Sequence, residues 1–155
     1  MNLKNLNILI TCVGGDNGVE IINQVKSNKF VNRTKIVGVD VKKDVVAKKF
    51  LDFYYKIPNT SKKKYIKSLE KIVKTHRINI ILATSDEESL ILSKHFQLNK
   101  KVQVATSSYN TLKILSNKIK TYEILEKNKI KLPKWKPINK EKDFESSIKY
   151  FEKIK

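Results

Sequence analysis

Short runs of consecutive apolar residues alternate along the chain with longer stretches in which apolar residues recur every three or four positions. Five runs are rich in β-branched residues, the pattern of strands buried on both faces of a sheet. They cover residues 7–13, 34–40, 53–57, 79–83 and 102–105. Such runs separated by helices form parallel sheets through right-handed crossovers. The sequence therefore predicts an α/β fold with an open, mainly parallel, five-stranded Rossmann-like sheet and helices on both faces.

The stretches with helical spacing differ in length. Helices are expected around residues 19–25, as a short turn within 44–51, from Ser61 onward, after Ser85, over 108–116 and 118–129, and from about 143 to the C-terminus. Ser85 to Glu88 has the form of a capping box, in which a serine and a glutamate three residues later satisfy the free N–H groups of a helix start. Because every stretch after residue 108 has helical spacing and no further β-branched run follows, the part after residue 108 is expected to be a helical linker with no further strand.

The last predicted helix carries an apolar stripe of Phe144, Ile148 and Phe151 that nothing in the sequence is evidently placed to cover. Such a stripe is expected to pack on another surface, either the sheet domain of the same chain or a second copy in a homodimer. We accordingly divide the chain into a Rossmann-like domain, 1–117, and a second segment, 118–155.

Composition limits the classes of protein that fit. The 155 residues suffice for one domain plus a fragment of another. Lysine and arginine number 33 against 15 acidic residues, a formal net charge of +18. The excess is spread along the whole chain, and only Arg33 and Arg77 are arginines, the residue preferred for recognising phosphates and bases. We therefore expect no specific nucleic-acid partner, although a basic nucleic-acid binder stays a distant alternative.

Other residue types narrow the chemistry further. Cys12 is the only cysteine, which excludes an internal disulfide and a cysteine-cluster metal site, and we expect it inside the first strand as a small buried residue. His76 and His95 have no evident ligand partner and are expected to be ordinary surface or core histidines. No apolar run reaches 18 residues, so we predict a cytoplasmic protein without a membrane partner.

Candidate chemistry lies where the strands end, because open parallel sheets bind ligands beyond the carboxyl ends of their strands. The turn with Gly14, Gly15 and Gly18 either offers N–H groups to an anion or only permits tight turning and close packing. Asp40 ends the second strand, where dinucleotide-binding sheets place the acid that holds ribose hydroxyls, or where an aspartate caps a loop.

Thr84, Asp86 and Glu87 follow the fourth strand and could position an amine or a metal, or could simply cap the next helix. One alternative for the whole chain is thus a stand-alone Rossmann-like module that binds a dinucleotide or a nucleotide-sugar through the glycine turn and Asp40.

Four segments taken together, NILITCVGGDNGVEIINQVK, KIVGVDVKKDVVAKKFLDFYYKIP, INIILATSDEESLILSKHF and LSNKIKTYEILEKNKIKLPKW, resemble the pre-ATP-grasp domain of carboxylate-amine ligases related to the carbamoyl-phosphate synthase large chain. The resemblance spans about residues 7–135. It implies the N-terminal substrate-binding part of an ATP-dependent ligase that joins a small-molecule carboxylate to an amine through an acyl-phosphate, with ATP and magnesium as cofactors of the full-length protein.

By the same resemblance Lys118 contacts ATP, and Gly14, Gly15, Asp40, Thr84, Asp86 and Glu87 line the substrate cleft. The family usually has a glycine near Lys129 and a small residue at Cys12. It also continues for about two hundred residues, so we expect the partner of this chain to be a missing ATP-grasp domain. The chain alone is expected to be a truncated, inactive piece that has no catalytic residue or metal ligand and binds no cofactor tightly.

Overall fold

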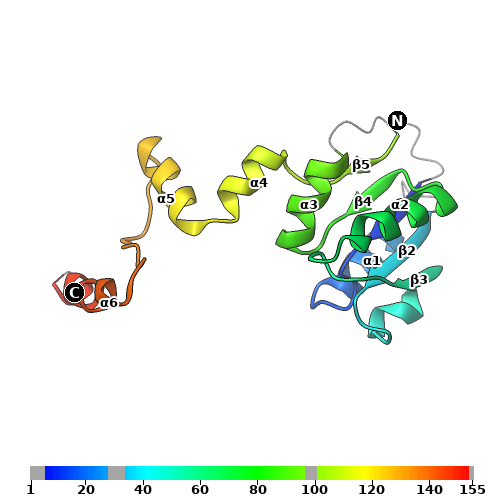
Figure 1. The fold of residues 1–155 in the computed structure, drawn as a ribbon, viewed down its shortest axis with the longest axis horizontal. Helices are drawn as coiled ribbons and strands as arrows, with labels where there is room; N and C mark the ends of the chain where they lie inside the picture. The colour runs from blue at the N-terminus through cyan, green and yellow to red at the C-terminus, as the bar shows by residue number, and fades with distance from the viewer. Residues whose placement is uncertain (1–5, 28–33, 97–100, 154–155) are drawn as a thin grey trace. The chain divides into compact units, whose positions relative to one another are not determined.

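The computed structural model describes residues 6–27, 34–96 and 101–153 (Figure 1). The chain divides into two compact units, Met1–Leu112 and Lys113–Lys155. The first unit contains β1 (Asn7–Ile10), α1 (Gly18–Ser27), β2 (Lys35–Asp40), the 3-10 helix η2 (Val46–Phe50), β3 (Phe53–Lys56), α2 (Lys64–His76), β4 (Ile80–Leu82), α3 (Asp86–Phe96) and β5 (Gln103–Val104). Helix α4 (Tyr109–Leu115) spans the boundary, and α5 (Lys118–Lys127) and α6 (Glu141–Glu152) belong to the second unit.

All five strands form one parallel sheet in the order β3-β2-β1-β4-β5. β1 therefore lies at the centre, with Ile8 paired to Ile36 of β2 on one side and to Ile80 of β4 on the other. The predicted fold class is confirmed. β2 and β3 are added on one side of β1, and β4 and β5 are then added on its other side, so the strand order reverses between β1 and β4.

Side chains from the central strand alternate between two separate cores, as the period of two in a strand requires. Ile8 and Ile10 pack with Ile22 of α1 on one face of the sheet. Leu9 packs on the other face with residues of α2 and α3, including Leu69 and Leu92. Helices thus cover both faces, which explains why the strands appear as continuous apolar runs in the sequence.

The first strand is shorter than the apolar run that predicts it. β1 ends at Ile10, and Cys12 lies in the following bend with a left-handed φ of 52° and a half-buried side chain. The expectation that Cys12 lies inside the strand as a buried residue was therefore wrong. The backbone continues to pair after the bend begins, since Thr11 N–H donates to Leu82 O (3.0 Å) and Val13 N–H to Val39 O (3.2 Å).

The second unit is held by contacts that its sequence explains locally. Asn117 caps α5, its side chain accepting a hydrogen bond from Lys120 N–H at 3.1 Å. Trp135 packs edge-to-face on Tyr122 and donates from Nε1 to Glu126 at 2.8 Å, which folds the proline-containing segment back on α5. The division at residue 117 stays a prediction, because the compact units separate five residues earlier.

The apolar stripe of α6 is exposed within its own unit, as the sequence indicates. Phe144, Ile148 and Phe151 keep exposed fractions of 56%, 44% and 39%. They line a hollow of about 390 Å³ together with Ile138 and Ser147.

Candidate functional site

The strand order places the candidate site at the carboxyl ends of β1, β2 and β4. In open parallel sheets the strands on either side of a reversal in strand order leave a crevice at their carboxyl ends, where ligands bind. Here the reversal lies between β1 and β4 (Figure 1). The segments that leave these strands are the glycine turn after β1 and the loop from Ala83 to Ser85 after β4. We call their surroundings the switch-point site.

The glycines of the turn are required for close approach and not for left-handed backbone. None of the glycines in the described residues has a positive φ, and Cys12 takes the left-handed position instead. A Cβ on Gly18 would lie 1.9 Å from the carbonyl oxygen of Val13, and one on Gly14 would lie 2.5 Å from a methyl of Val45. Gly14 and Gly18 are therefore needed for close packing, while the residue with left-handed backbone in this turn is Cys12.

The N–H groups of the three turn glycines are already engaged within the chain. Gly14 N–H donates to the Asp40 carboxylate at 2.7 Å, Gly15 N–H to Cys12 O at 3.1 Å, and Gly18 N–H to Gly15 O at 3.0 Å. The anion at the first of these groups is thus a side chain of the protein itself. This arrangement disfavours a phosphate cradle at Gly14 and Gly15, whose contact with substrate stays a prediction.

Asp40 is the tie between the second strand and the turn. Its side chain has an exposed fraction of only 5%, and its second oxygen accepts Lys42 N–H at 2.9 Å. Both carboxylate oxygens therefore face main-chain donors. An aspartate that holds ribose hydroxyls would need at least one oxygen directed to the ligand.

Thr84 connects the two sides of the switch point. Its hydroxyl lies 2.7 Å from Thr11 O and 3.2 Å from Cys12 O, so it donates to the turn that leaves β1. The structure thus brings Thr84, Asp40 and the glycine turn together, as the sequence predicts. Asp86 and Glu87 stand exposed in the first turn of α3, and Glu87 accepts a 3.3 Å hydrogen bond from the Thr60 hydroxyl.

The cap of α3 is Ser85, since its hydroxyl accepts Glu88 N–H at 3.3 Å. The serine half of the predicted capping box is confirmed, while the Glu88 carboxylate accepts a hydrogen bond from the Ser85 hydroxyl at 3.3 Å, and Asp86 and Glu87 take no part in this pairing. Their carboxylates still interact favourably with the positive end of the helix. Their role toward a substrate stays a prediction.

Glu88 is the residue that sequence reasoning missed. It is buried, with 7% of its surface exposed, and accepts a buried hydrogen bond from the Tyr65 hydroxyl at 2.9 Å. Burial and the Glu88 carboxylate raise the pKa of Tyr65 far above its usual range, so the phenol stays a donor. The sequence offers a faint indication only, the glutamate of the Ser85 capping box, because Tyr65 lies 23 residues away.

The Cys12 thiol faces this carboxylate-rich environment. Burial raises its pKa, and the Glu88 and Asp40 carboxylates raise it further. A thiol held in its neutral form is a poor nucleophile and metal ligand. The raised pKa therefore disfavours a reactive thiol at Cys12.

Residues for nucleotide and metal are less evident. Lys118 is the exposed first residue of α5 in the second unit. Within the described ranges no three histidine, cysteine, aspartate or glutamate residues gather in a group that could hold a metal ion. The chain's own described residues thus do not fit a magnesium site. In the same part of the chain no helix has the length and apolarity needed to cross a membrane.

Comparison with known proteins places this geometry in a family. A family model described as the PylC-like, N-terminal domain matches residues 8–107, from the second residue of β1 to beyond the end of β5. No curated protein matches the chain.

Solved structures are similar over nearly the whole chain. N5-carboxyaminoimidazole synthetase from Staphylococcus aureus, complexed with ADP, is 16% identical over 96% of this chain and 36% of that chain, with a TM-score of 0.66. L-amino acid ligase from Bacillus licheniformis is 12% identical over 95% of this chain and 42% of that one, with a TM-score of 0.62. These similarities show a common fold, and the chain spans less than half the length of either protein.

Proposed function

The chain belongs to the family of PylC-like N-terminal domains, and from this premise we propose that it is the N-terminal, substrate-binding part of an ATP-dependent ligase that joins a carboxylate to an amine. In such a reaction the carboxylate takes the terminal phosphoryl group of ATP, which leaves as ADP, and the amine then attacks the resulting acyl-phosphate with release of phosphate. ATP and magnesium act in the full-length enzyme, and a separate ATP-grasp domain supplies the groups that hold them. A homodimer through the α6 stripe and a cytoplasmic location belong to the same proposal.

The observation that carries the proposal is the chemical character of the switch-point site. The surface of the chain is strongly basic, with a formal net charge of +18. At the carboxyl ends of the strands, in contrast, acidic side chains follow β2 and β4: Asp40 ends β2 and is bonded to the turn after β1, and the first turn of α3 carries Asp86, Glu87 and Glu88. Carboxylates in this position favour the ammonium group of an amine substrate over a phosphate.

In this proposal the exposed Asp86 and Glu87 meet the substrate, while Asp40 and Glu88 shape the site from below. Asp40 fixes the glycine turn through Gly14, and the Tyr65 hydroxyl fixes Glu88. Thr84 keeps the two loops at a constant separation through its hydrogen bond to Thr11 O. Gly14 and Gly15 keep the floor of the cleft free of side chains, and Lys118 contacts the adenine nucleotide.

The alternative, a dinucleotide or nucleotide-sugar module, would use the same turn differently. It needs a free anion site at the glycine N–H groups and an aspartate directed to a ribose. Because the Asp40 carboxylate occupies the first and is itself held by two main-chain donors, the alternative is disfavoured.

Titration of the isotope-labelled chain, followed by amide NMR spectra, tests the proposal. L-alanine should bind weakly, in the millimolar range, and shift the signals of residues 84–88 and of the glycine turn. The pair Asp86→Asn with Glu87→Gln should abolish those shifts, whereas Glu20→Gln, on the exposed face of α1, should leave them intact. Micromolar binding of NAD at the glycine turn, with no response to L-alanine, would replace the ligase proposal by the alternative.

A further inference from the structure

A groove lies between helix α2 and β3, the strand at one edge of the sheet. It consists of two hollows, of about 670 and 270 Å³, that meet at Lys56 and Ile57, which line both. We call it the α2–β3 groove. On the helix side its lining residues recur every three or four positions, the spacing of one helix face. They are Lys64, Ser68, Lys71 and Thr75.

The α2–β3 groove reaches the open edge of β3. Successive side chains of a strand point to opposite faces of the sheet, so a hollow lined by both Tyr55 and Lys56 extends to the edge between those faces. Among the described strands, β3 has a neighbour only on its β2 side, where Ile57 N–H donates to Asp40 O at 2.9 Å. Main-chain groups alternate between the two sides of a strand, so those of Tyr54 and Lys56 face outward. The edge therefore presents main-chain N–H and C=O groups that an added strand could pair with.

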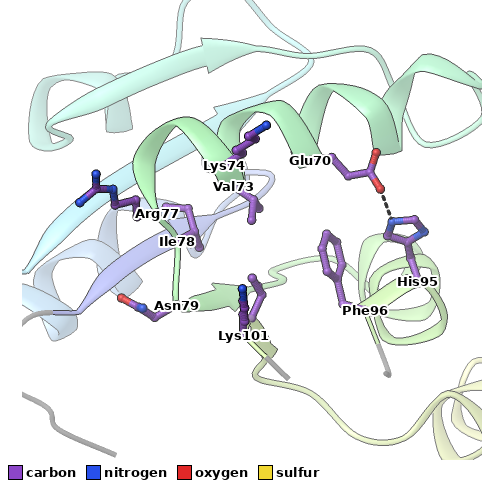
Figure 2. A pocket seen from close by; sticks show the side chains of 10 residues that line it. Glu70, Val73, Lys74, Arg77, Ile78, Asn79, His95, Phe96 and Lys101 are labelled. Carbon is purple, nitrogen blue, oxygen red and sulfur yellow. Dashed lines mark hydrogen bonds and ion pairs between the residues drawn. The ribbon is translucent and has the colours of Figure 1, made fainter. Parts of the chain in front are cut away.

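Five exposed lysines line the groove, and no described acidic residue does. They are Lys56, Lys62, Lys63, Lys64 and Lys71. Within the described part of the chain, none of the five forms an ion pair with a carboxylate. The one acidic residue of α2, Glu70, is directed to His95 of α3 instead, at 2.8 Å, as Figure 2 shows. The groove therefore favours an anionic partner.

Helix stability does not explain the lysines at the start of α2. The first turn of this helix contains no acidic residue, and its N-cap, Lys63, makes no side-chain cap hydrogen bond. Positive charges near the N-terminus of a helix oppose its dipole. Helix α3 shows the favourable arrangement, since its first turn carries Asp86, Glu87 and Glu88. An anion bound beside the lysines of α2 would offset the cost of placing them there.

The floor of the groove is apolar and is held in place before any partner binds. Ile57 and Ile72 line it and are both buried. The Tyr55 hydroxyl lies 2.8 Å from His76 Nε2, and the His76 ring packs on the ring of Phe53 with centroids 4.5 Å apart. These contacts tie β3 to the end of α2. A surface fixed in this way loses less entropy when a partner binds.

The charge of the groove selects among possible occupants. Lysines on an edge strand oppose pairing between identical chains, and a second copy with a formal net charge of +18 would be repelled. Nucleic acid is disfavoured as well, because all five cations are lysines, without the planar fork with which arginine recognises phosphates and bases. Carboxylates, by contrast, pair with lysine in many geometries.

We propose that the α2–β3 groove binds an acidic, extended segment of a partner protein. The backbone of the segment pairs with the edge of β3, and its carboxylates lie beside the lysines. In this mode main-chain hydrogen bonds supply affinity and alternate side chains supply specificity. The proposal is independent of the ligase proposal, since the groove shares no residue with the glycine turn or with the loop after β4.

The test uses, as a probe of the 155-residue chain, a blocked peptide in which glutamate and valine alternate over about eight residues, within the usual length of a strand. Amide NMR spectra should show this peptide shifting the signals of residues 53–57 and 62–76. Hydrogen exchange at the amides of Tyr54 and Lys56 should slow, because the added strand protects them. A peptide with lysine in place of glutamate should not bind.

The double variant Lys64→Gln/Lys71→Gln removes one charge from each hollow and should weaken peptide binding about fivefold, the effect of two exposed charge pairs. The matched control is Lys67→Gln/Lys74→Gln, which removes the same charge from exposed residues of the same helix that line neither hollow. It should change the affinity by less than about twofold. Thermal melting checks that both double variants fold.

Four results would overturn the proposal. Equal weakening by the two double variants would reduce the effect to general charge. Binding of an oligothymidylate of the same charge as tightly as the peptide would indicate a nucleic-acid surface. Unchanged hydrogen exchange at Tyr54 and Lys56 would exclude strand pairing. Signals of residues 53–57 that shift with the concentration of the chain alone would identify a second copy as the occupant.

Discussion

Asp40→Asn removes the charge and one acceptor from the side chain that ties β2 to the glycine turn. In the wild type Gly14 N–H and Lys42 N–H each donate to one carboxylate oxygen, at 2.7 and 2.9 Å. Asparagine has one acceptor oxygen, so its NH₂ group must face the second main-chain donor. Lys42 is exposed and water can replace the lost partner there. The expected loss is therefore one charge-assisted hydrogen bond, about 1.5–3 kcal/mol of unfolding free energy.

Urea unfolding followed by far-UV circular dichroism measures this loss. The only tryptophan, Trp135, belongs to the second unit, so its fluorescence would not follow the sheet. With a urea dependence of about 1–3 kcal/mol per molar, the midpoint should fall by about 1 M. Asp44→Asn is the matched control, because the Asp44 side chain is 81% exposed and its ion pair, Oδ1 to Lys48 Nζ at 3.7 Å, is a surface contact. It should cost less than about 0.5 kcal/mol, and an Asp40→Asn variant equal to this control would refute the structural role of Asp40.

Three further outcomes are expected. Lys129→Gly should stabilise the second unit by about 0.5–1 kcal/mol, because the φ of Lys129 is 59°, a left-handed value that glycine adopts without strain. Unfolding in urea followed by Trp135 fluorescence would measure this gain, and an unchanged midpoint would contradict it. Tyr65→Phe should lower the free energy of unfolding by about 1.5–3 kcal/mol, because it removes the hydroxyl that donates the buried hydrogen bond to Glu88. Urea unfolding followed by circular dichroism would detect this loss, and a midpoint equal to that of the wild type would refute it. Burial and the nearby Lys35 lower the pKa of His76 in the folded chain below the value of about 6.5 that it has in the unfolded chain. As the pH falls below about 6.5, the unfolded chain therefore binds this proton more readily than the folded chain, and the free energy of unfolding should decrease. A His76→Gln variant should show a flatter dependence between pH 7 and 5, and an equally steep one would exclude His76 as its source.

The strands and their common direction could be predicted because burial on both faces imposes continuous apolar runs. The resemblance to the pre-ATP-grasp domain of ligases is likewise confirmed at the level of the family. The ends of the strands could not be predicted to the residue. The run of β1 extends to Val13, but the ladder is interrupted at Cys12, where hydrogen bonds to Gly15 and Thr84 replace strand pairing.

The location of the candidate site could be predicted from the sequence, but the hydrogen bonds between its residues could not. Asp40 and Thr84 were expected near the glycine turn because parallel strands end at one edge. Their partners depend on tertiary contacts: Asp40 binds an N–H group 26 residues earlier, and Thr84 binds a carbonyl 73 residues earlier. Glu88 was missed for the same reason, since Tyr65, which buries and fixes it, comes from another helix.

The glycine pattern locates the turn after β1 but does not identify its left-handed residue, which is Cys12. Cys12 and Lys129 both have a positive φ, at a cost of about 1–2 kcal/mol each for a residue with a Cβ. At Cys12 the left-handed bend directs the carbonyl oxygen to Gly15 N–H at 3.1 Å, and the Thr84 hydroxyl, whose shorter hydrogen bond goes to Thr11 O, lies 3.2 Å away; these contacts offset part of the cost. Gly14 and Gly18 then serve a different need, the absence of a Cβ beside Val45 and Val13. A glycine introduced at position 12 would relieve the strain but leave both glycines necessary, so Cys12→Gly should be tolerated where Gly18→Ala, which places a Cβ 1.9 Å from a main-chain oxygen, is not.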